Sequence, residues 1–314
     1  MGVEAQPVVE IEFVVEPNYD GWRLDKYLCV KIRRLSRTRV QRIIERDLVG
    51  SLKASSLLRR GQVIKIRRRM LSEPDDIPPP SALGTLYSDD QLLVLDKPPG
   101  LPIHPTARYH HGTLVSQLKE RGIEAFPAHR LDRETSGIVV CGRTLEASQR
   151  LMESFSGGHV KKQYLAIVEG SPPDTYFVDA PIAEGTELIR IAVRIDASGK
   201  PARTRFQVEK RFGAFALVRA FPETGRQHQI RIHSREAGFP LVGDKMYGPD
   251  PGYFDRFSKH CLEEEAWERL RLPRHALHAA AIAFEHPTSK KNVSFESPLP
   301  ADLTGFVELS SRAS

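Results

Sequence analysis

The sequence predicts an α+β protein in which a small N-terminal domain precedes a larger domain with a mixed, mainly antiparallel sheet. Three observations support this prediction. The segment from residue 20 to residue 70 is strongly basic and has the pattern of two short helices next to strands. The stretch "EPDDIPPPSA" then interrupts regular structure, because proline fits neither a helix interior nor a sheet ladder. Beyond it, many strand-length runs follow one another with few helices, which favours α+β over a doubly wound fold.

Length and composition limit the class of protein. A chain of 314 residues can form one large domain and a small one. The sequence has no apolar run of 18 residues, so we expect no membrane span, and its start lacks the pattern of a signal peptide. The three cysteines, Cys29, Cys141 and Cys261, are far apart and form no C-x-x-C pair. They indicate no disulfide framework or zinc ribbon and favour a reducing, cytoplasmic setting.

The net charge of +6 is unevenly distributed along the chain. Between Asp20 and Met70 there are 16 Lys and Arg against 4 Asp and Glu, so this segment carries +12 and the remainder −6. Such a concentrated basic block indicates a polyanionic partner, most often nucleic acid. The alternative is a charged surface that serves only solubility.

The basic block begins with a predicted strand at residues 10–17, followed by a helix in "GWRLDKYLCVKI" with Asp25 in its first turn. A carboxylate stabilises a helix at that position. A second helix starts from Ser36, a good N-cap, and we expect "LVGSLKASS" and "GQVIKIRRR" to form short strands. Four arginines of the second helix are candidate nucleic-acid-binding residues, of which the last three share one face: Arg37, Arg39, Arg42 and Arg46.

We place domain boundaries at residues 15–72, 73–82 and 83–310, with the middle range as a stiff linker. The third range opens with the strand "LLVLDKP". It continues with "SGIVVCGRT", the helical "LEASQRLMESF", and the strands "KKQYLAIVEG", "ARTRFQVEKRF", "AFALVRAFP", "RQHQIRIH" and "HALHAAAIAFEHP". The repeated succession of strand after strand predicts an antiparallel or mixed sheet.

The segment "HRLDRETSG", His129 to Gly137, contains the first candidate catalytic residue. Asp132 is flanked by His129, Arg130 and Arg133, and nearby cations favour an ionised carboxylate. On a loop between rigid elements such a group can act as nucleophile or base. Taken alone, a structural Asp–Arg pair is the commoner explanation of this tripeptide.

A second segment, "ETGRQHQIRIH", supplies a possible partner for Asp132. We read it as a turn followed by a strand, on which Gln227, Gln229, Arg231 and His233 face one way and Arg226 and His228 the other. Because a lone buried charge is unfavourable, Arg231 is expected to pair with an acid, and Asp132 is a candidate. Tyr164 lies on the same strand face as Lys162, and on periodicity alone ordinary core packing is the favoured explanation for it.

Metal binding has weak support in the sequence. His110 and His111 are adjacent, and His228 and His233 would face opposite sides of a strand. His275 and His278 could share a helix face, but no further ligand is evident. We therefore expect no metal.

The N-terminal domain resembles the S4 family of RNA-binding domains. The resemblance rests on Arg23-Leu24-Asp25 opening the first helix, Ser36-Arg37 opening the second, and "GQVI" starting the final strand. The middle turn departs from the family pattern, since "SLKASS" replaces the usual turn. The resemblance implies an RNA partner and makes Asp25 a structural helix-start residue.

The remaining motifs closely resemble the RluA-type pseudouridine synthases over roughly residues 15 to 300. "HRLDRETSG", "KQYLAIVEG", "TGRQHQIRIH", "LVGDKMYG" and "RHALHA" occur in that order. The resemblance makes Asp132 the essential aspartate, Tyr164 the tyrosine that packs on the target base, and Arg231 the arginine that pairs with the aspartate. It places His129, Arg130, Arg226 and His228 among the substrate-binding residues, and Asp244 in a pocket-shaping motif. The family needs no cofactor and no metal.

The resemblance implies an isomerase that converts uridine to pseudouridine in structured RNA, with large-subunit ribosomal RNA as the favoured substrate and transfer RNA as the alternative. A nucleoside or glycoside hydrolase is the enzymatic rival, but it usually needs two carboxylates, and a second one is not evident beside Asp132. A non-catalytic RNA-binding protein that uses only the basic domain is the remaining alternative.

Overall fold

The computed structural model describes residues 8–32, 37–69, 83–105, 112–185, 191–250, 252–259 and 261–312. The chain divides into two compact units, Met1–Glu73 and Pro74–Ser314. Each unit has its own hydrophobic core, because every cluster of buried apolar side chains found among the described residues draws on one unit only. The predicted linker, 73–82, lies outside the described residues.

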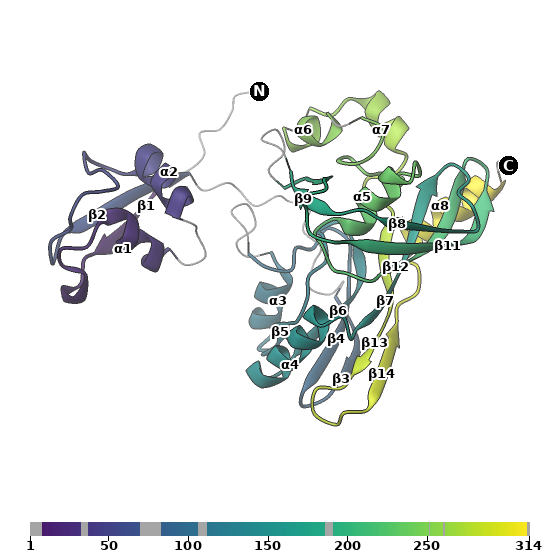
Figure 1. Ribbon diagram of the computed structural model, residues 1–314, viewed down its shortest axis with the longest axis horizontal. Helices are drawn as coiled ribbons and strands as arrows, with labels where there is room; N and C mark the ends of the chain where they lie inside the picture. Colours follow the sequence, from purple (N-terminus) through teal and green to yellow (C-terminus); the bar gives the residue numbers. More distant parts are fainter. Residues whose placement is uncertain are drawn as a thin grey trace. The chain divides into compact units, whose positions relative to one another are not determined.

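The first unit packs two helices beside a two-stranded antiparallel ribbon (Figure 1). Its elements in chain order are β1 (Val8–Val14), the short 3-10 helix η1 (Pro17–Tyr19), α1 (Leu24–Lys31), α2 (Arg37–Asp47) and β2 (Val63–Arg69). Leu24, Tyr27 and Leu28 of α1 are buried against Val40 and Ile44 of α2. Helical spacing of these apolar residues explains why both segments are helical.

Two predictions for this unit have different outcomes. The strand predicted in "LVGSLKASS" is wrong, because residues 48–56 form bends and turns whose ladder contact is the isolated bridge Leu48–Ile66. Asp25 is fully buried in the first turn of α1, where its carboxylate accepts hydrogen bonds from the guanidinium groups of Arg23 and Arg37. This contact joins the start of α1 to the start of α2, so Asp25 has the structural position expected of it.

The second unit is built on one sheet that holds ten of its described strands (Figure 1). The hydrogen-bonded path runs β3–β4–β6–β13–β7–β12–β11–β8, with β14 added on β13 and β5 on β6. The bounds are β3 (Gly84–Ser88), β4 (Leu92–Lys97), β5 (Phe126–Pro127), β6 (Ser136–Gly142), β7 (Lys161–Glu169), β8 (Thr175–Asp179), β11 (Arg203–Phe212), β12 (Phe215–Pro222), β13 (Leu277–Glu285) and β14 (Asn292–Glu296). β6 and β13 pair in parallel and the other pairs are antiparallel, which confirms the predicted mixed, mainly antiparallel sheet. A separate ribbon joins β9 (Ile182–Glu184) to β10 (Val193–Ile195).

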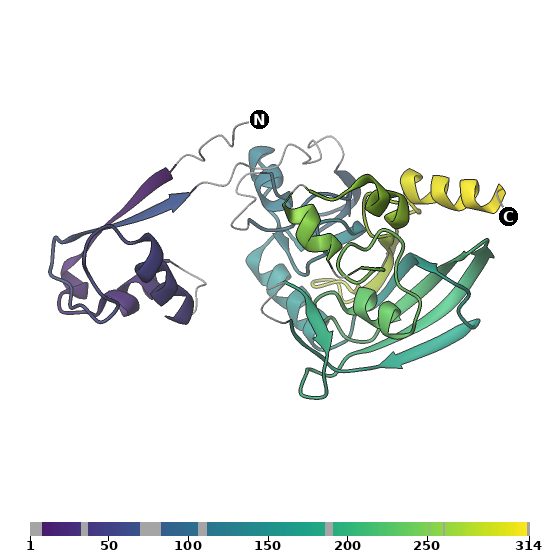
Figure 2. The same cartoon turned by 90° about the horizontal axis from the view of Figure 1, so that it is seen from above.

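Helices cover both faces of this sheet. They are α3 (Leu114–Glu120), α4 (Leu145–Ser156), α5 (Gln229–Glu236), α6 (Tyr253–Ser258), α7 (Glu264–Leu270) and α8 (Ala301–Arg312). α3 packs on Val139 and α4 on the next residue, Val140, so these helices lie on opposite faces of the β4–β6 half. By the same alternation α5 packs beside Ala166 and α8 beside Ile167, and α8 lies next to β11 (Figures 1 and 2).

The segment "RQHQIRIH" differs from its prediction. We expected a strand with alternating faces, but residues 229–236 form helix α5, preceded by a turn that ends at His228. The assignment of Gln227, Gln229, Arg231 and His233 to one strand face is therefore wrong. His275 and His278 do not share a helix either, since His278 lies on β13.

Two further observations concern the chain as a whole. Among the residues described, no helix has both the length and the apolar character needed to cross a bilayer. All three cysteines are free thiols, and Cys141 is buried in β6.

Candidate active site

Asp132 lies on a tight turn that leads into β6, and three hydrogen bonds hold that turn. The backbone N–H of Thr135 donates to the carbonyl of Asp132 at 3.1 Å. The carbonyl of Arg133 accepts from the backbone of Gly100 at 2.9 Å and from the side-chain nitrogen of Lys97 at 3.1 Å. Lys97 is buried and also donates to the carbonyl of Leu101 at 2.9 Å. The end of β4 and the loop after it thus hold the backbone next to Asp132 in place.

The Asp132 carboxylate faces a cationic side chain of α5. Nη1 of Arg231 donates to Oδ2 of Asp132 at 3.0 Å, and Nε2 of His228 lies 3.7 Å from Oδ1. The predicted ion pair between Asp132 and Arg231 is therefore present, although α5 is a helix. Burial would raise the pKa of Asp132, but the guanidinium of Arg231 beside it helps to hold this pKa below its ordinary value. The group is an ionised, partly buried carboxylate.

A second acid orients Arg231 from the other side. Asp244 is fully buried and accepts from Nε and Nη2 of Arg231 at 2.7 and 2.8 Å. It also accepts from the backbone N–H groups of Met246 and Tyr247 at 2.9 and 3.0 Å. Burial raises the pKa of Asp244, but these cationic and N–H partners lower it by more. The net result is a pKa below the ordinary value. The two-point contact leaves only one edge of the guanidinium for Asp132.

Glu134 belongs to a separate network that supports the same turn. Its carboxylate lies 3.1 Å from the side-chain nitrogen of Lys245 and 3.3 Å from Nδ1 of His275. The other ring nitrogen of His275 is 2.8 Å from the hydroxyl of Thr135. Burial opposes but does not prevent the net lowering of the pKa of Glu134 by these partners. Glu134 is thus an engaged anion and does not offer a second acid beside Asp132.

Tyr164 stands on β7 where two hydrophobic clusters meet, one under α3 and one under α5. It lies on the α3 and α5 face of the sheet, the face that also carries Arg231. Burial, and to a lesser extent the charge of Asp132, raise the pKa of Tyr164. The phenol is therefore neutral, and the charge of Asp132 contributes to keeping it so.

Three other predicted residues do not converge on Asp132 in the same way. Nε2 of His129 accepts from the backbone of Val140 at 3.0 Å, and the ring stacks on Phe155 with centroids 4.5 Å apart. Arg130 is exposed. Arg226 is exposed and donates to the carbonyl of Pro201 at 3.1 Å. Their substrate-binding roles stay predictions.

The predicted RNA-binding arginines lie on α2 of the first unit. Arg42 and Arg46 are exposed, and Arg46 donates to Asp47 at 2.8 Å. Arg37 is exposed but donates to Asp25. The side chain of Arg39 falls outside the described residues. Exposed Arg42 is available to an anionic partner, whereas Arg37 and Arg46 would have to exchange their pairs with Asp25 and Asp47.

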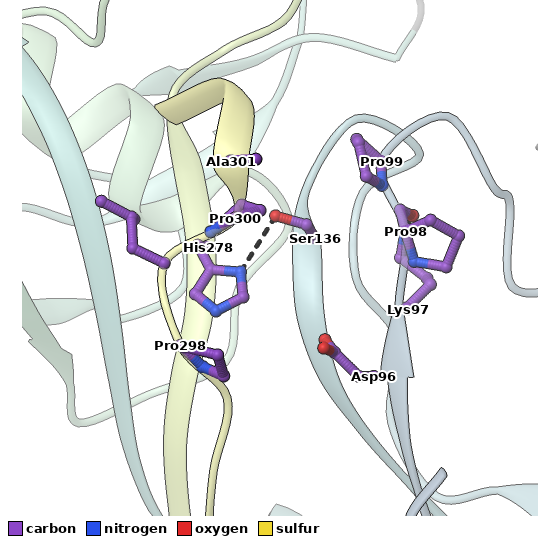
Figure 3. A pocket seen from close by; sticks show the side chains of 10 residues that line it. Asp96, Lys97, Pro98, Pro99, Ser136, His278, Pro298, Pro300 and Ala301 are labelled. Carbon is purple, nitrogen blue, oxygen red and sulfur yellow. Dashed lines mark hydrogen bonds between the residues drawn. The ribbon is translucent and has the colours of Figure 1, made fainter. Parts of the chain in front are cut away.

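A cavity of about 370 Å³ lies in the second unit, where α8 begins, on the face of the sheet opposite to α3 and α5 (Figure 3). Asp96, Lys97, Ser136 and His278 line it together with several prolines. The hydroxyl of Ser136 is 3.0 Å from Nδ1 of His278. Ser136 and His278 alternate with the residues that face α3 and α5, so this cavity is distinct from the space in front of Asp132.

Sequence reasoning missed the supporting residues Tyr247, Lys245, Glu134 and His275. Tyr247 follows Asp244 by three positions in "LVGDKMYG", and the motif itself was the only signal for it. In the part of the chain that the structure describes, no group of three or more His, Cys, Asp or Glu side chains is arranged to hold a metal ion.

Comparisons with known proteins agree with this geometry. The family model "RNA pseudouridylate synthase" matches residues 91–236, which include Asp132, Tyr164 and Arg231. The "Ribosomal large subunit pseudouridine synthase D" of Nitrosomonas europaea is 36% identical and the match covers 95% of this chain and 87% of that protein. The "Ribosomal large subunit pseudouridine synthase C" of Vibrio cholerae is 30% identical, and the match covers 94% of this chain and 95% of that protein. The solved structure "Human RNA Pseudouridylate Synthase Domain Containing 1" aligns with a TM-score of 0.57 at 25% identity, covering 77% of this chain and 98% of that one.

Fold, motifs and relatives together define an RNA pseudouridine synthase, an isomerase that acts on RNA. The chain belongs to the RluA family of these enzymes.

Proposed function

We propose that this enzyme isomerises specific uridines in structured RNA, with large-subunit ribosomal RNA as its substrate, and that Asp132 carries the reaction. The observation that supports Asp132 most is its ion pair with Arg231, which keeps a partly buried carboxylate charged and aimed. The support for ribosomal RNA is that similar proteins from several bacteria are named large-subunit synthases C or D. Transfer RNA is the alternative substrate.

The reaction needs the target base outside its helix. The C1′–N1 bond of the uridine breaks, the uracil turns, and a C1′–C5 bond forms while C5 loses a proton and N1 gains one. These atoms are inaccessible in a stacked base, so the base must be flipped at an expense of a few kcal/mol. Stacking on an aromatic ring such as Tyr164 contributes roughly 1–3 kcal/mol toward this expense.

Asp132 acts on the flipped nucleotide as nucleophile or as base. Arg231 stabilises the charged carboxylate through a charge-assisted hydrogen bond. The first unit, with exposed Arg42 and Arg46 on α2, is an S4-like domain that binds RNA phosphates in this proposal. It therefore supplies affinity, whereas the second unit supplies chemistry.

The test of the catalytic assignment is Asp132→Asn, which keeps the shape of the side chain and removes its charge. We expect no release of tritium from RNA labelled at C5 of uridine, because that release accompanies product formation. RNA affinity should stay within about threefold, since the phosphate contacts are unchanged. Full turnover by the variant would refute the role of Asp132, and free uracil without a C–C product would indicate a hydrolase.

The test of the substrate is a map of pseudouridine in cells with and without the gene. We expect one or more sites in large-subunit ribosomal RNA to revert to uridine in its absence. Loss confined to transfer RNA would overturn the ribosomal assignment and leave the reaction assignment intact.

A further inference from the structure

The hydroxyl of Tyr247 is placed between a backbone donor and a histidine of the active site. Tyr247 is buried, with 3% of its surface exposed. Its oxygen accepts from the backbone N–H of Val193 at 2.8 Å and lies 2.8 Å from Nδ1 of His228. The guanidinium of Arg231 lies 5.0 Å from the centre of the Tyr247 ring. One side chain therefore contacts both residues that face the Asp132 carboxylate.

These contacts favour one position for the proton of His228. A phenol carries one proton and can accept hydrogen bonds at its oxygen lone pairs. The N–H of Val193 occupies one lone pair of Tyr247, so the phenol proton is free to be donated to Nδ1 of His228. A neutral imidazole that accepts at Nδ1 carries its own proton at Nε2. Nε2 is the atom that faces Oδ1 of Asp132, at 3.7 Å.

Burial keeps both His228 and Tyr247 neutral. Burial is the main cause that lowers the pKa of His228 to about 4, and Arg231 and His275 act in the same direction. Asp132 and Asp244 oppose them without reversing the shift. Burial also raises the pKa of Tyr247 to about 12. At neutral pH the imidazole is uncharged and the phenol keeps the proton that it donates.

The backbone of His228 has a conformation that points to a positional requirement. Its φ is 54° and its ψ is 17°, the left-handed region that residues other than glycine rarely adopt. Such a conformation is energetically unfavourable and persists only where surrounding contacts impose it. Here it places the histidine directly before α5, with its ring between Tyr247 and Asp132.

We propose that Tyr247 is a positioning residue of this active site: its hydroxyl fixes His228 in the tautomer whose Nε2–H is directed at Oδ1 of Asp132. Arg231 holds Oδ2 and His228 directs a neutral donor at Oδ1, so the orientation of the carboxylate is set at both oxygens. The 3.7 Å separation exceeds a hydrogen bond, so the proposal requires the two groups to approach by about 0.7 Å when substrate binds. The proposal rests on the proposed role of Asp132 in turnover.

The first test compares the full-length protein with Tyr247→Phe, which keeps the ring and removes the hydroxyl. Ring-nitrogen NMR spectra of protein labelled with ¹⁵N-histidine report the tautomer, and the signals of His228 are those absent from His228→Gln. We expect one tautomer, protonated at Nε2, in the natural protein and a mixture in Tyr247→Phe. Turnover at saturating RNA should fall about tenfold or more, with KM changed less than about threefold.

Tyr176→Phe is the matched control for loss of a buried hydroxyl. The hydroxyl of Tyr176 is buried, and no hydrogen-bond partner for it is found in the described part of the chain. We expect this variant to keep the His228 signals and the turnover of the natural protein. Equal melting temperatures for Tyr176→Phe and Tyr247→Phe would support a specific role of the Tyr247 hydroxyl.

A second pair of variants tests whether the position of the N–H donor on the side chain of residue 228 matters for turnover. His228→Gln places an N–H donor near the position of Nε2, and His228→Asn places one near Nδ1. We expect the glutamine variant to retain at least about tenfold more turnover than the asparagine variant. Equal turnover of the two variants would overturn the proposal, as would unchanged His228 signals or unchanged turnover in Tyr247→Phe.

The spectra also separate this proposal from the proposed function. If Asp132→Asn keeps full turnover, the role of Asp132 fails, whereas the tautomer of His228 is still decided by the NMR comparison. If Asp132→Asn is inactive and the His228 signals do not respond to Tyr247→Phe, only the present proposal fails.

Discussion

The guanidinium of Arg231 binds two carboxylates, each through different nitrogen atoms. Nε and Nη2 bind Asp244, and Nη1 binds Asp132. The sequence predicted the pair with Asp132, because an arginine among apolar residues needs an acid. It did not predict the two-point contact with Asp244, since a separation along the chain implies no distance in space. The residue that orients the catalytic pair is therefore visible only in the fold.

We predict that Arg231→Lys lowers turnover by about 100-fold or more and destabilises the protein by roughly 3–5 kcal/mol. A lysine cannot make the planar, two-point contact, so Asp244 would be left buried with an incomplete partner. Chemical unfolding and the tritium-release assay measure the two effects. Arg219→Lys is the control, because its pair with Glu209 is about 30% exposed and should contribute less than about 1 kcal/mol. Equal unfolding free energies of the two variants would contradict this account.

The buried imidazole of His228 also predicts how stability depends on pH. Burial is the main cause that lowers the pKa of His228 from 6.5 in the unfolded chain to about 4 in the folded one. Between these values the unfolded chain binds more protons, so the free energy of unfolding decreases as pH falls from about 6.5 toward 4. The contribution is on the order of 3 kcal/mol, since one pKa unit corresponds to about 1.4 kcal/mol. His228→Gln should flatten this slope in urea titrations at several pH values, and an unchanged slope would contradict the prediction.

At the scale of elements, α5 shows where periodicity misleads. In "QIRIH" apolar and polar residues alternate, which is the pattern of a half-buried strand. The helix that forms instead is buried from Gln229 to Ser234, so these residues present no solvent-exposed polar face. Its polar side chains are satisfied by specific partners, such as Gln229 donating to the carbonyl of Arg203 at 2.8 Å. The sequence predicted the strands with clear apolar runs or alternation, namely β4, β6, β7, β11, β12 and β13, but not β3, β5, β8 or β14.

Gly137 gives a prediction for the one parallel pair found among the described strands. Its φ is +105°, and a Cβ there would lie 2.3 Å from the carbonyl oxygen of Ala279 on β13. Gly137→Ala should therefore destabilise the second unit by roughly 3 kcal/mol or more, through backbone strain and a clash that the backbone cannot relieve. Thermal unfolding of the second unit measures the effect.

The control for Gly137→Ala is Gly305→Ala, because Gly305 lies inside α8 with nothing within 4 Å of the added Cβ. This change should stabilise the protein by about 0.5–1 kcal/mol, the usual helix preference of alanine over glycine. A melting temperature that falls equally in both variants would show that the β6–β13 contact is not the cause.

At the scale of the whole molecule, charge and chemistry belong to different units. The +12 segment lies in the first unit, and Asp132, Arg231 and Tyr164 lie in the second. Composition was enough to predict this division, because clustered charge and a run of prolines are properties of the sequence itself.

Removal of residues 1–72 should weaken RNA binding and flatten its salt dependence without unfolding the second unit. The five hydrophobic clusters found among the described residues of the second unit contain no residue of the first, so the second unit should retain its cooperative melting transition. Each cation–phosphate pair that the deletion removes lowers the slope of log K against log salt by about 0.7–0.9, so removing roughly three to five such pairs would reduce it by about 2–4. Binding isotherms at several salt concentrations measure the slope.

Arg42→Gln in the full-length protein should lower the slope by the amount of about one phosphate pair. Lys210→Gln removes an exposed cation on β11 and is the matched control. Identical slopes for the full-length and shortened proteins would mean that the basic unit does not bind RNA, whereas loss of the melting transition would mean that the second unit depends on the first to fold.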